Sequence, residues 1–123
     1  MSALKTGLDG AGVFGGYHAG KIAASDQTTF IGEFDPDQVR ANRLAETHDV
    51  EAFASQDALF KACDAILVAC PAMYHEAVVR AALQANCHVM VEKPLALTGN
   101  AADELAALAD EKGLLLQVGH QER

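Results

Sequence analysis

Short runs of apolar residues alternate along the chain with longer segments in which apolar positions recur every three or four residues. The short runs lack the polar alternation of half-exposed strands and predict strands buried on two faces, whereas the longer segments predict amphipathic helices. The expected strands are Lys5–Asp9, Thr28–Phe34, Ala65–Ala69, His88–Val91 and Leu114–Val118, with a weaker one at Glu51–Phe53. This alternation predicts one doubly wound parallel sheet of the α/β class, in the strand order 3-2-1-4-5-6.

Three helices have boundaries that can be read from the sequence. The first is expected to follow Asp35, with Pro36 in its first turn and an apolar stripe that begins at Ala41. The second has a stripe of small or apolar residues: Tyr74, Ala77, Val78, Ala81, Ala82 and Ala85. The third is capped by Thr98 or Asn100 and ends at Gly113.

Length and composition favour a single domain over residues 1–123. The chain is 50% hydrophobic and 21% charged, which is typical of a soluble globular protein. Its formal charge of -8, with only nine scattered basic residues, argues against a nucleic-acid groove. The start of the chain lacks the long apolar core of a signal peptide, and no run approaches the roughly 18 apolar residues of a membrane span, so we expect a cytoplasmic protein without a membrane partner.

The three cysteines show no metal or disulfide spacing. Cys63, Cys70 and Cys87 contain no Cys-x-x-Cys pair, so the sequence indicates no metal site. We expect three reduced thiols in the core, since free cysteine is among the most buried residue types.

The most specific local signal is a glycine-rich turn between the first strand and the helix expected after it. In Gly10-Ala11-Gly12-Val13-Phe14-Gly15, Gly10 permits the tight turn, Gly12 lets a diphosphate approach the backbone, and Gly15 lets helix and strand pack closely. Free N–H groups at the helix N-terminus then attract the phosphates. The sequence therefore predicts a dinucleotide-binding turn.

An acidic residue follows at the distance that this fingerprint requires. Asp35 lies about 20 residues after Gly15, where its carboxylate can accept hydrogen bonds from the adenosine ribose. It is followed by Pro36 and Asp37 and not by an Arg or Lys that would accept a 2′-phosphate, which favours NAD over NADP. A structural alternative is that Asp35 is the N-cap of the following helix, and the two roles are compatible.

With these motifs the chain resembles the glucose-fructose oxidoreductase and inositol dehydrogenase family, Gfo/Idh/MocA. The resemblance covers the whole chain and includes the glycine turn with His18. Three further blocks carry it: Cys70-Pro71-Ala72-Met73-Tyr74-His75, His88-Val89-Met90-Val91-Glu92-Lys93-Pro94-Leu95-Ala96 and Val118-Gly119-His120-Gln121-Glu122-Arg123. It implies a Rossmann domain and NAD(P)-linked chemistry at a carbinol carbon of a sugar, cyclitol or related polyol. A methyltransferase with a similar first turn would not explain Glu92-Lys93-Pro94.

The resemblance also implies roles for single residues. Lys93 would lie near the nicotinamide and the reacting hydroxyl as the catalytic residue, and Glu92 would contact the cofactor or brace the turn before Pro94, whose peptide bond is expected to be cis. Cys70 and Pro71 would line the cofactor crevice. His75, also placed in the cofactor site, and His18 are more often packing residues at helix ends, and His120 is a weaker candidate on the substrate side.

Family members normally continue into an α+β domain that supplies the polyol pocket, an acid–base group and subunit contacts, whereas this sequence ends at Arg123. We therefore expect the second family domain to be absent, and these residues to bind cofactor without useful turnover. The alternative is a non-catalytic module, native or engineered, whose main property is self-association, because losing a domain exposes apolar surface. A homo-oligomer is expected in either case.

Two acids depart from the family pattern, which prefers apolar or small residues at their positions. Asp9 directly precedes Gly10, and Glu33 lies in the neighbouring strand, so each must reach solvent, a partner or a proton. At about 6 Å from a diphosphate and an effective dielectric of about 20, an ionised Asp9 would repel it by roughly 3 kcal/mol before screening. Two interpretations stay open: native residues at the exposed edge of the crevice, or substitutions that alter cofactor use or assembly.

Overall fold

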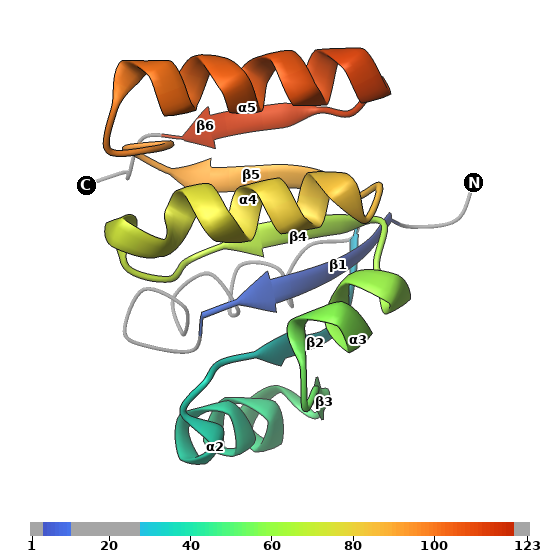
Figure 1. The fold of residues 1–123 in the computed structure, drawn as a ribbon. Coiled ribbons are helices and arrows are strands. Elements are labelled where there is room, and N and C mark those ends of the chain that lie inside the picture. Colours follow the sequence, from blue (N-terminus) through green and yellow to red (C-terminus); the bar gives the residue numbers. More distant parts are fainter. Residues whose placement is uncertain (1–3, 11–27, 120–123) are drawn as a thin grey trace.

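A computed structural model describes residues 4–10 and 28–119 of the chain. Its six strands form one parallel sheet in the order β3-β2-β1-β4-β5-β6, as the sequence predicts. Their bounds are Leu4–Asp9 (β1), Thr28–Phe34 (β2), Glu51–Ala52 (β3), Ala65–Val68 (β4), His88–Glu92 (β5) and Leu116–Gly119 (β6). Because all pairs are parallel, the carboxyl ends of the strands share one edge of the sheet, on the left in Figure 1.

Four α-helices and one short 3-10 helix connect the described strands. They are α2 (Gln38–His48), α3 (Gln56–Ala62), η1 (Ala72–Tyr74), α4 (His75–Gln84) and α5 (Gly99–Lys112). Helix α5 is capped by the Thr98 hydroxyl and ends at Gly113 with φ 68°, so Thr98 and not Asn100 is the N-cap. Helix α3 was not predicted, although Ser55 caps it through the Ala58 N–H.

The start of α2 differs from the prediction. The N-cap is Asp37, whose carboxylate accepts hydrogen bonds from the backbone N–H groups of Val39 and Arg40. Pro36 therefore precedes the helix and Asp35 is not its cap. The physical reason is local: Asp35 instead accepts a hydrogen bond from the Asp37 N–H at 2.7 Å, which turns the chain one step before the helix begins.

The hydrophobic core lies on both faces of the sheet. One cluster joins β4 and β5 to α3, α4 and α5, with Leu59, Phe60, Ile66, Leu83 and Leu105 among its fully buried members. Figure 1 shows α4 and α5 side by side over this face. A smaller cluster of Leu8, Leu44 and Leu67 joins β1 and β4 to α2. Both clusters fix the strand ends whose loops form the candidate site.

Several residues of interest lie outside the described ranges. They are Gly12, Val13, Phe14, Gly15, His18 and His120. Within the described part, no helix is long and apolar enough to cross a bilayer.

Candidate dinucleotide-binding site

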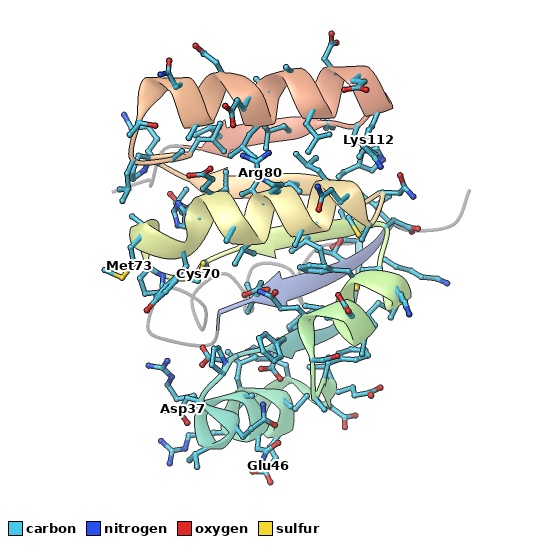
Figure 2. All side chains as sticks on the ribbon, in the orientation of Figure 1. Asp37, Glu46, Cys70, Met73, Arg80 and Lys112 are labelled. Carbon is cyan, nitrogen blue, oxygen red and sulfur yellow. The ribbon has the colours of Figure 1, made fainter. Side chains whose placement is uncertain are left out.

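The sequence-predicted residues that the structure describes gather at the carboxyl edge of the sheet. Gly10 follows β1, Asp35 follows β2, Cys70 and Pro71 follow β4, and Lys93 follows β5. Figure 2 shows Cys70, Met73 and Asp37 near this edge and Lys112 toward the opposite one. The order of the strands reverses between β1 and β4, and ligands of doubly wound sheets bind in the crevice at such a switch point.

Gly10 occupies a position that only glycine fits. Its φ of 115° lies in the region that L side chains rarely adopt, and a Cβ there would lie 2.7 Å from both the Ala69 carbonyl carbon and the Cys70 nitrogen. The Gly10 N–H donates to the Phe34 carbonyl at 2.9 Å, and the Ala69 N–H donates to the Asp9 carbonyl at 2.8 Å. The turn after β1 is thus fixed against the ends of both neighbouring strands.

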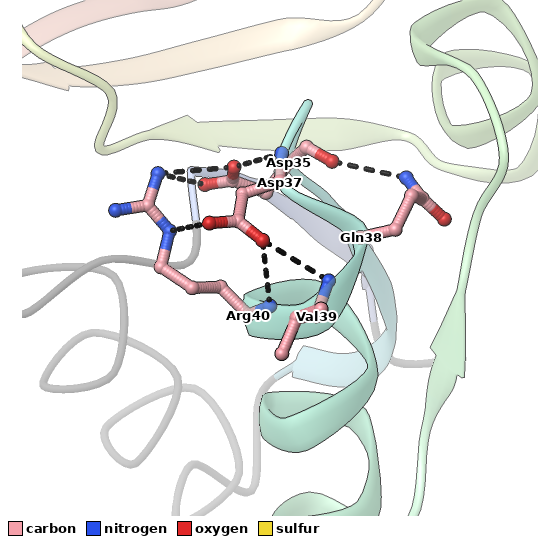
Figure 3. A network of polar contacts seen from close by, with 5 residues as sticks. All are labelled: Asp35, Asp37, Gln38, Val39 and Arg40. Atoms are coloured by element: carbon pink, nitrogen blue, oxygen red, sulfur yellow. Dashed lines mark hydrogen bonds and ion pairs between the residues drawn. The ribbon is translucent and has the colours of Figure 1, made fainter.

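Asp35 lies buried beside this turn in a network of polar contacts (Figure 3). Its carboxylate accepts hydrogen bonds from the Asp37 N–H at 2.7 Å and from the Arg40 guanidinium at 3.2 Å. Arg40 also lies 3.6 Å from the carboxylate of Asp37, and its side chain is about half exposed. The Arg40 guanidinium therefore lies beside the predicted ribose-binding acid. It comes about one helical turn after Pro36 and Asp37, the two positions at which the sequence analysis looked for a basic residue.

Asp9, the last residue of β1 before the same turn, is also buried. Its side chain is 2% exposed, and Oδ2 accepts a hydrogen bond from the Gln56 amide at 2.9 Å. Burial raises the pKa of Asp9 to about 7; the Gln56 hydrogen bond opposes this rise and the negative charge of Asp35 adds to it. Near neutral pH, Asp9 is therefore divided between its protonated and ionised forms.

Glu33 is fully buried, and no residue of the described part forms a hydrogen bond with either of its carboxylate oxygens. In the β1–β2 register it pairs with Leu8, while Asp9 pairs with Phe34, so Asp9 and Glu33 project from opposite faces of the sheet. Burial, with the charge of Asp35, raises the pKa of Glu33 to about 7. The interpretation that both acids lie at an exposed edge is therefore wrong, because both side chains are buried and Asp9 contacts Gln56 of α3.

The loops after β4 and β5 are joined by a histidine. His75, the first residue of α4, is 3% exposed; its Nδ1 lies 2.6 Å from the Pro94 carbonyl and its Nε2 lies 2.9 Å from the Cys70 carbonyl. Carbonyls only accept, so the ring donates to both when both nitrogens carry protons. Lys93 is exposed, its N–H donates to the Gly119 carbonyl at 3.2 Å, and the Lys93–Pro94 bond is cis, as the sequence resemblance implies.

The thiol nearest this edge is inert at neutral pH. Cys70 is partly buried, and burial, with a contribution from Asp9, raises the pKa of its thiol to about 12. A protonated thiol is a poor nucleophile, so Cys70 has no covalent role at neutral pH. All three cysteines are free, but only Cys87 is fully buried.

A shallow open depression of about 510 Å³ lies on the β2–β3 side of the edge. Its lining consists of residues from the ends of β2 and β3 and the start of α3: Phe34, Pro36, Ala54, Ser55, Gln56 and Asp57. It adjoins the Asp35 turn through Pro36 and the Asp9–Gln56 contact through Gln56.

Comparison with known proteins adds to this geometry. The sequence pattern of one family, described as an oxidoreductase family with an NAD-binding Rossmann fold, matches residues 4–120. The chain belongs to the Gfo/Idh/MocA oxidoreductase family. The fold and the family that the sequence resemblance implies are both confirmed.

Similar proteins of solved structure include complexes with either dinucleotide. UDP-N-acetylglucosamine 3-dehydrogenase of Acidithiobacillus ferrooxidans is 39% identical over 123 residues, and its solved structure matches with a TM-score of 0.91 over 97% of this chain. GenD2 from gentamicin A biosynthesis, in complex with NAD, is 30% identical (TM-score 0.92, 97% of this chain). Biliverdin reductase from Synechocystis sp. PCC 6803, in complex with biliverdin and NADP+, is 31% identical (TM-score 0.89, 95% of this chain).

This Gfo/Idh/MocA chain is short beside these relatives. It spans 39% of the dehydrogenase, 35% of GenD2 and 38% of the reductase. The described part corresponds to the cofactor-binding portion of the family, since the family pattern that it matches is that of the NAD-binding fold.

Two residues of the site were missed by sequence reasoning. Gln56, which hydrogen-bonds Asp9, is 47 positions away, and no local pattern links them. Arg40 was passed over because the prediction considered only the residues directly after Asp35; a helix that starts at Gln38 brings position 40 back toward the cap.

Proposed function

We propose that this chain is the NAD-binding part of an oxidoreductase that acts on a CH–OH group of a sugar, cyclitol or related polyol. The observation that carries the proposal is the hydrogen bond from the Gly10 N–H to the Phe34 carbonyl. It holds the glycine turn, where a diphosphate would bind, beside the strand end that carries Asp35, where a ribose would bind. Family membership and the dehydrogenase relative support the same chemistry.

In this proposal the site residues divide between the two halves of the cofactor. Gly10, Gly12, Val13, Phe14 and Gly15 hold the diphosphate and Asp35 holds the adenosine ribose. On the nicotinamide side lie Cys70, Pro71, His75, Glu92 and Lys93. Lys93 is the proposed catalytic residue, because its exposed ammonium follows β5 at the mouth of the crevice, where it can orient a substrate hydroxyl.

We propose NAD as the preferred cofactor. The buried carboxylate of Asp35 favours ribose hydroxyls and repels a 2′-phosphate, and the same carboxylate already holds the Arg40 guanidinium. Arg40 is the cation that would oppose this preference, since its half-exposed side chain can leave Asp35 for a phosphate. The preference therefore depends on the Asp35–Arg40 contact.

Calorimetric titration with NAD and NADP tests the proposal directly. We expect NAD to bind more tightly than NADP, and NAD at about 100 times its dissociation constant to raise the free energy of unfolding by about 2.7 kcal/mol. A chain that binds neither dinucleotide would refute the proposed function. Tighter binding of NADP would refute only the cofactor preference.

We also propose that residues 1–123 alone bind cofactor without useful turnover. Hydride transfer needs a polyol held in near-attack geometry beside a proton acceptor, and the proposed site accounts for the cofactor alone. The test is NADH formation by the purified chain with a panel of sugars and cyclitols. Turnover at rates ordinary for dehydrogenases would contradict this proposal.

Self-association is the second candidate function, favoured by the exposed apolar side chains of Met73, Tyr74 and Leu97, which lie 54–68% exposed in and after the loops of the crevice. Sedimentation with and without NAD separates the two. A module that assembles and ignores NAD would replace the proposed function, whereas a homo-oligomer that binds NAD is compatible with it. Localisation in the cytoplasm stays a prediction.

A further inference from the structure

His75 connects two loops that the sheet itself no longer holds together. The β4–β5 ladder ends at the pair Val68 and Val91, and beyond it the chain continues into separate turns. The imidazole spans these turns, with Nε2 2.9 Å from the carbonyl of Cys70 and Nδ1 2.6 Å from the carbonyl of Pro94. One buried ring therefore extends the connection between adjacent strands into the crevice.

The same contact limits the backbone around Lys93 from both sides. The Lys93 N–H donates to the carbonyl of Gly119 on β6, at 3.2 Å, and the next carbonyl along the chain, that of Pro94, faces the His75 ring. The direction in which the Lys93 side chain leaves the loop is set by these two fixed points. A helix-end histidine that served packing alone would not require both ring nitrogens to face carbonyls of two different loops.

We infer that His75 is a positioning residue for the nicotinamide half of the cofactor. It fixes the spacing between the Cys70–Pro71 turn and the Lys93–Pro94 turn, and it does not touch the adenosine half, which lies on the β1–β2 side of the switch point. This inference rests on the proposed function. It predicts that loss of the ring nitrogens weakens binding of the whole dinucleotide but not of a ligand that lacks nicotinamide.

The experiment titrates the 123-residue chain with NADH and with ADP-ribose by calorimetry. The variants are His75→Phe, which keeps an aromatic ring without donors, and His75→Gln, which has one amide nitrogen in place of the two ring nitrogens. The matched control is His88→Phe: His88 is a half-buried histidine whose Nδ1 accepts a hydrogen bond from the Leu115 N–H at 3.1 Å, at the opposite end of β5. Urea unfolding of each variant reports whether it folds.

We expect His75→Phe to raise the dissociation constant for NADH about tenfold while that for ADP-ribose stays within about twofold, the effect of losing one or two buried hydrogen bonds. The ratio of the dissociation constant for NADH to that for ADP-ribose should be intermediate in His75→Gln. In His88→Phe it should equal that of the parent chain. If urea unfolding of His75→Phe is not cooperative, the NADH and ADP-ribose affinities of His75→Gln test the inference instead. If the ratio of the two dissociation constants is unchanged in His75→Phe, or if NADH and ADP-ribose both bind more weakly by the same factor, the inference is wrong but the proposed function stands. If the parent chain binds neither ligand, both the inference and the proposed function are wrong.

Discussion

The buried Asp9 should make this domain less stable as pH rises toward 8. Asp9→Asn should remove the share of that loss due to Asp9, while the share due to Glu33, whose pKa is also raised to about 7, should remain. The pKa of Asp9 is raised from the ordinary 3.8 to about 7, chiefly by burial. Below about pH 4 the carboxyl is protonated in both the folded and the unfolded chain, so it has no effect. Between about pH 4 and 7 the unfolded chain releases the proton while the folded chain retains it, and stability falls.

The size of the effect follows from the same values. Each tenfold difference in proton affinity corresponds to about 1.4 kcal/mol, so full ionisation of Asp9 costs the folded chain on the order of 4 kcal/mol above pH 7. A domain of this size has a total stability of about 5–15 kcal/mol, so the loss is a large fraction. Asp9→Asn keeps an oxygen that accepts the hydrogen bond from the Gln56 amide and has no charge to bury.

Urea unfolding followed by far-ultraviolet circular dichroism at pH 5, 6, 7 and 8 measures this difference. We expect the parent to lose several kcal/mol over the series, and Asp9→Asn to lose less and to be the more stable protein at pH 8. The matched control is Asp110→Asn, which removes an exposed carboxylate from α5 and should follow the parent. Parallel profiles for the parent and Asp9→Asn would refute the reasoning, because the charge would then be accommodated at no cost.

Three further predictions concern the same edge of the sheet. NAD should bind more weakly as pH rises through 7, because an ionised Asp9 repels the diphosphate. In calorimetry the NAD affinity of Asp9→Asn should change less with pH. The same pH dependence in Asp9→Asn as in the parent would contradict this prediction. Gly10→Ala should destabilise the fold by roughly 3 kcal/mol or more in urea unfolding, because the added Cβ would lie 2.7 Å from backbone atoms. The control Gly113→Ala, with open space around its Cβ, should cost only about 1 kcal/mol. Equal costs for the two variants would show that the turn at Gly10 can move. Arg40→Ala should raise the dissociation constant for NADP about tenfold and that for NAD less than threefold; equal changes would mean that Arg40, now paired with Asp35, does not face the 2′ position.

The strand order could be predicted because it depends on features that recur along the chain. Apolar runs without polar alternation fix which segments are strands, and right-handed crossovers leave few arrangements of six parallel strands. The bounds of β2 agree with the prediction, while β6 begins at Leu116, two residues later than expected. Such ends depend on pairing with the neighbouring strand, here Val89 with Leu116, which a local pattern does not contain.

The helices show where local reasoning stops. Helix α3 has seven residues, fewer than two full turns, so its periodicity is too short to recognise. In α4 the predicted stripe included Tyr74, which is exposed, and missed Val79 and Leu83, which are buried. That helix contacts both β5 and α5, so its buried face is wider than a single apolar stripe.

The candidate site divides in the same way between local and long-range signals. Gly10 and Asp35 were found because a turn and a strand end constrain their own residue types. The Asp9–Gln56 hydrogen bond and the His75 contacts to two loops arise from packing between segments that are distant in sequence. Sequence alone indicated that Asp9 and Glu33 must find a partner or a proton; among the residues that the structure describes, Asp9 has a partner and Glu33 has none.

The two halves of the crevice hold different side chains, and this difference makes the proposals separable. The β1–β2 half holds Asp9, Glu33 and Asp35 with Arg40 as a counter-charge, whereas the β4–β5 half holds His75, Glu92 and Lys93. A change at Asp9 acts on the diphosphate, which NADH and ADP-ribose share, so Asp9→Asn should shift the affinity of both ligands equally. A change at His75 should shift NADH alone. If Asp9→Asn instead changed the NADH to ADP-ribose ratio, the two halves would be coupled through the sheet, and the assignment of each residue to one half would be wrong.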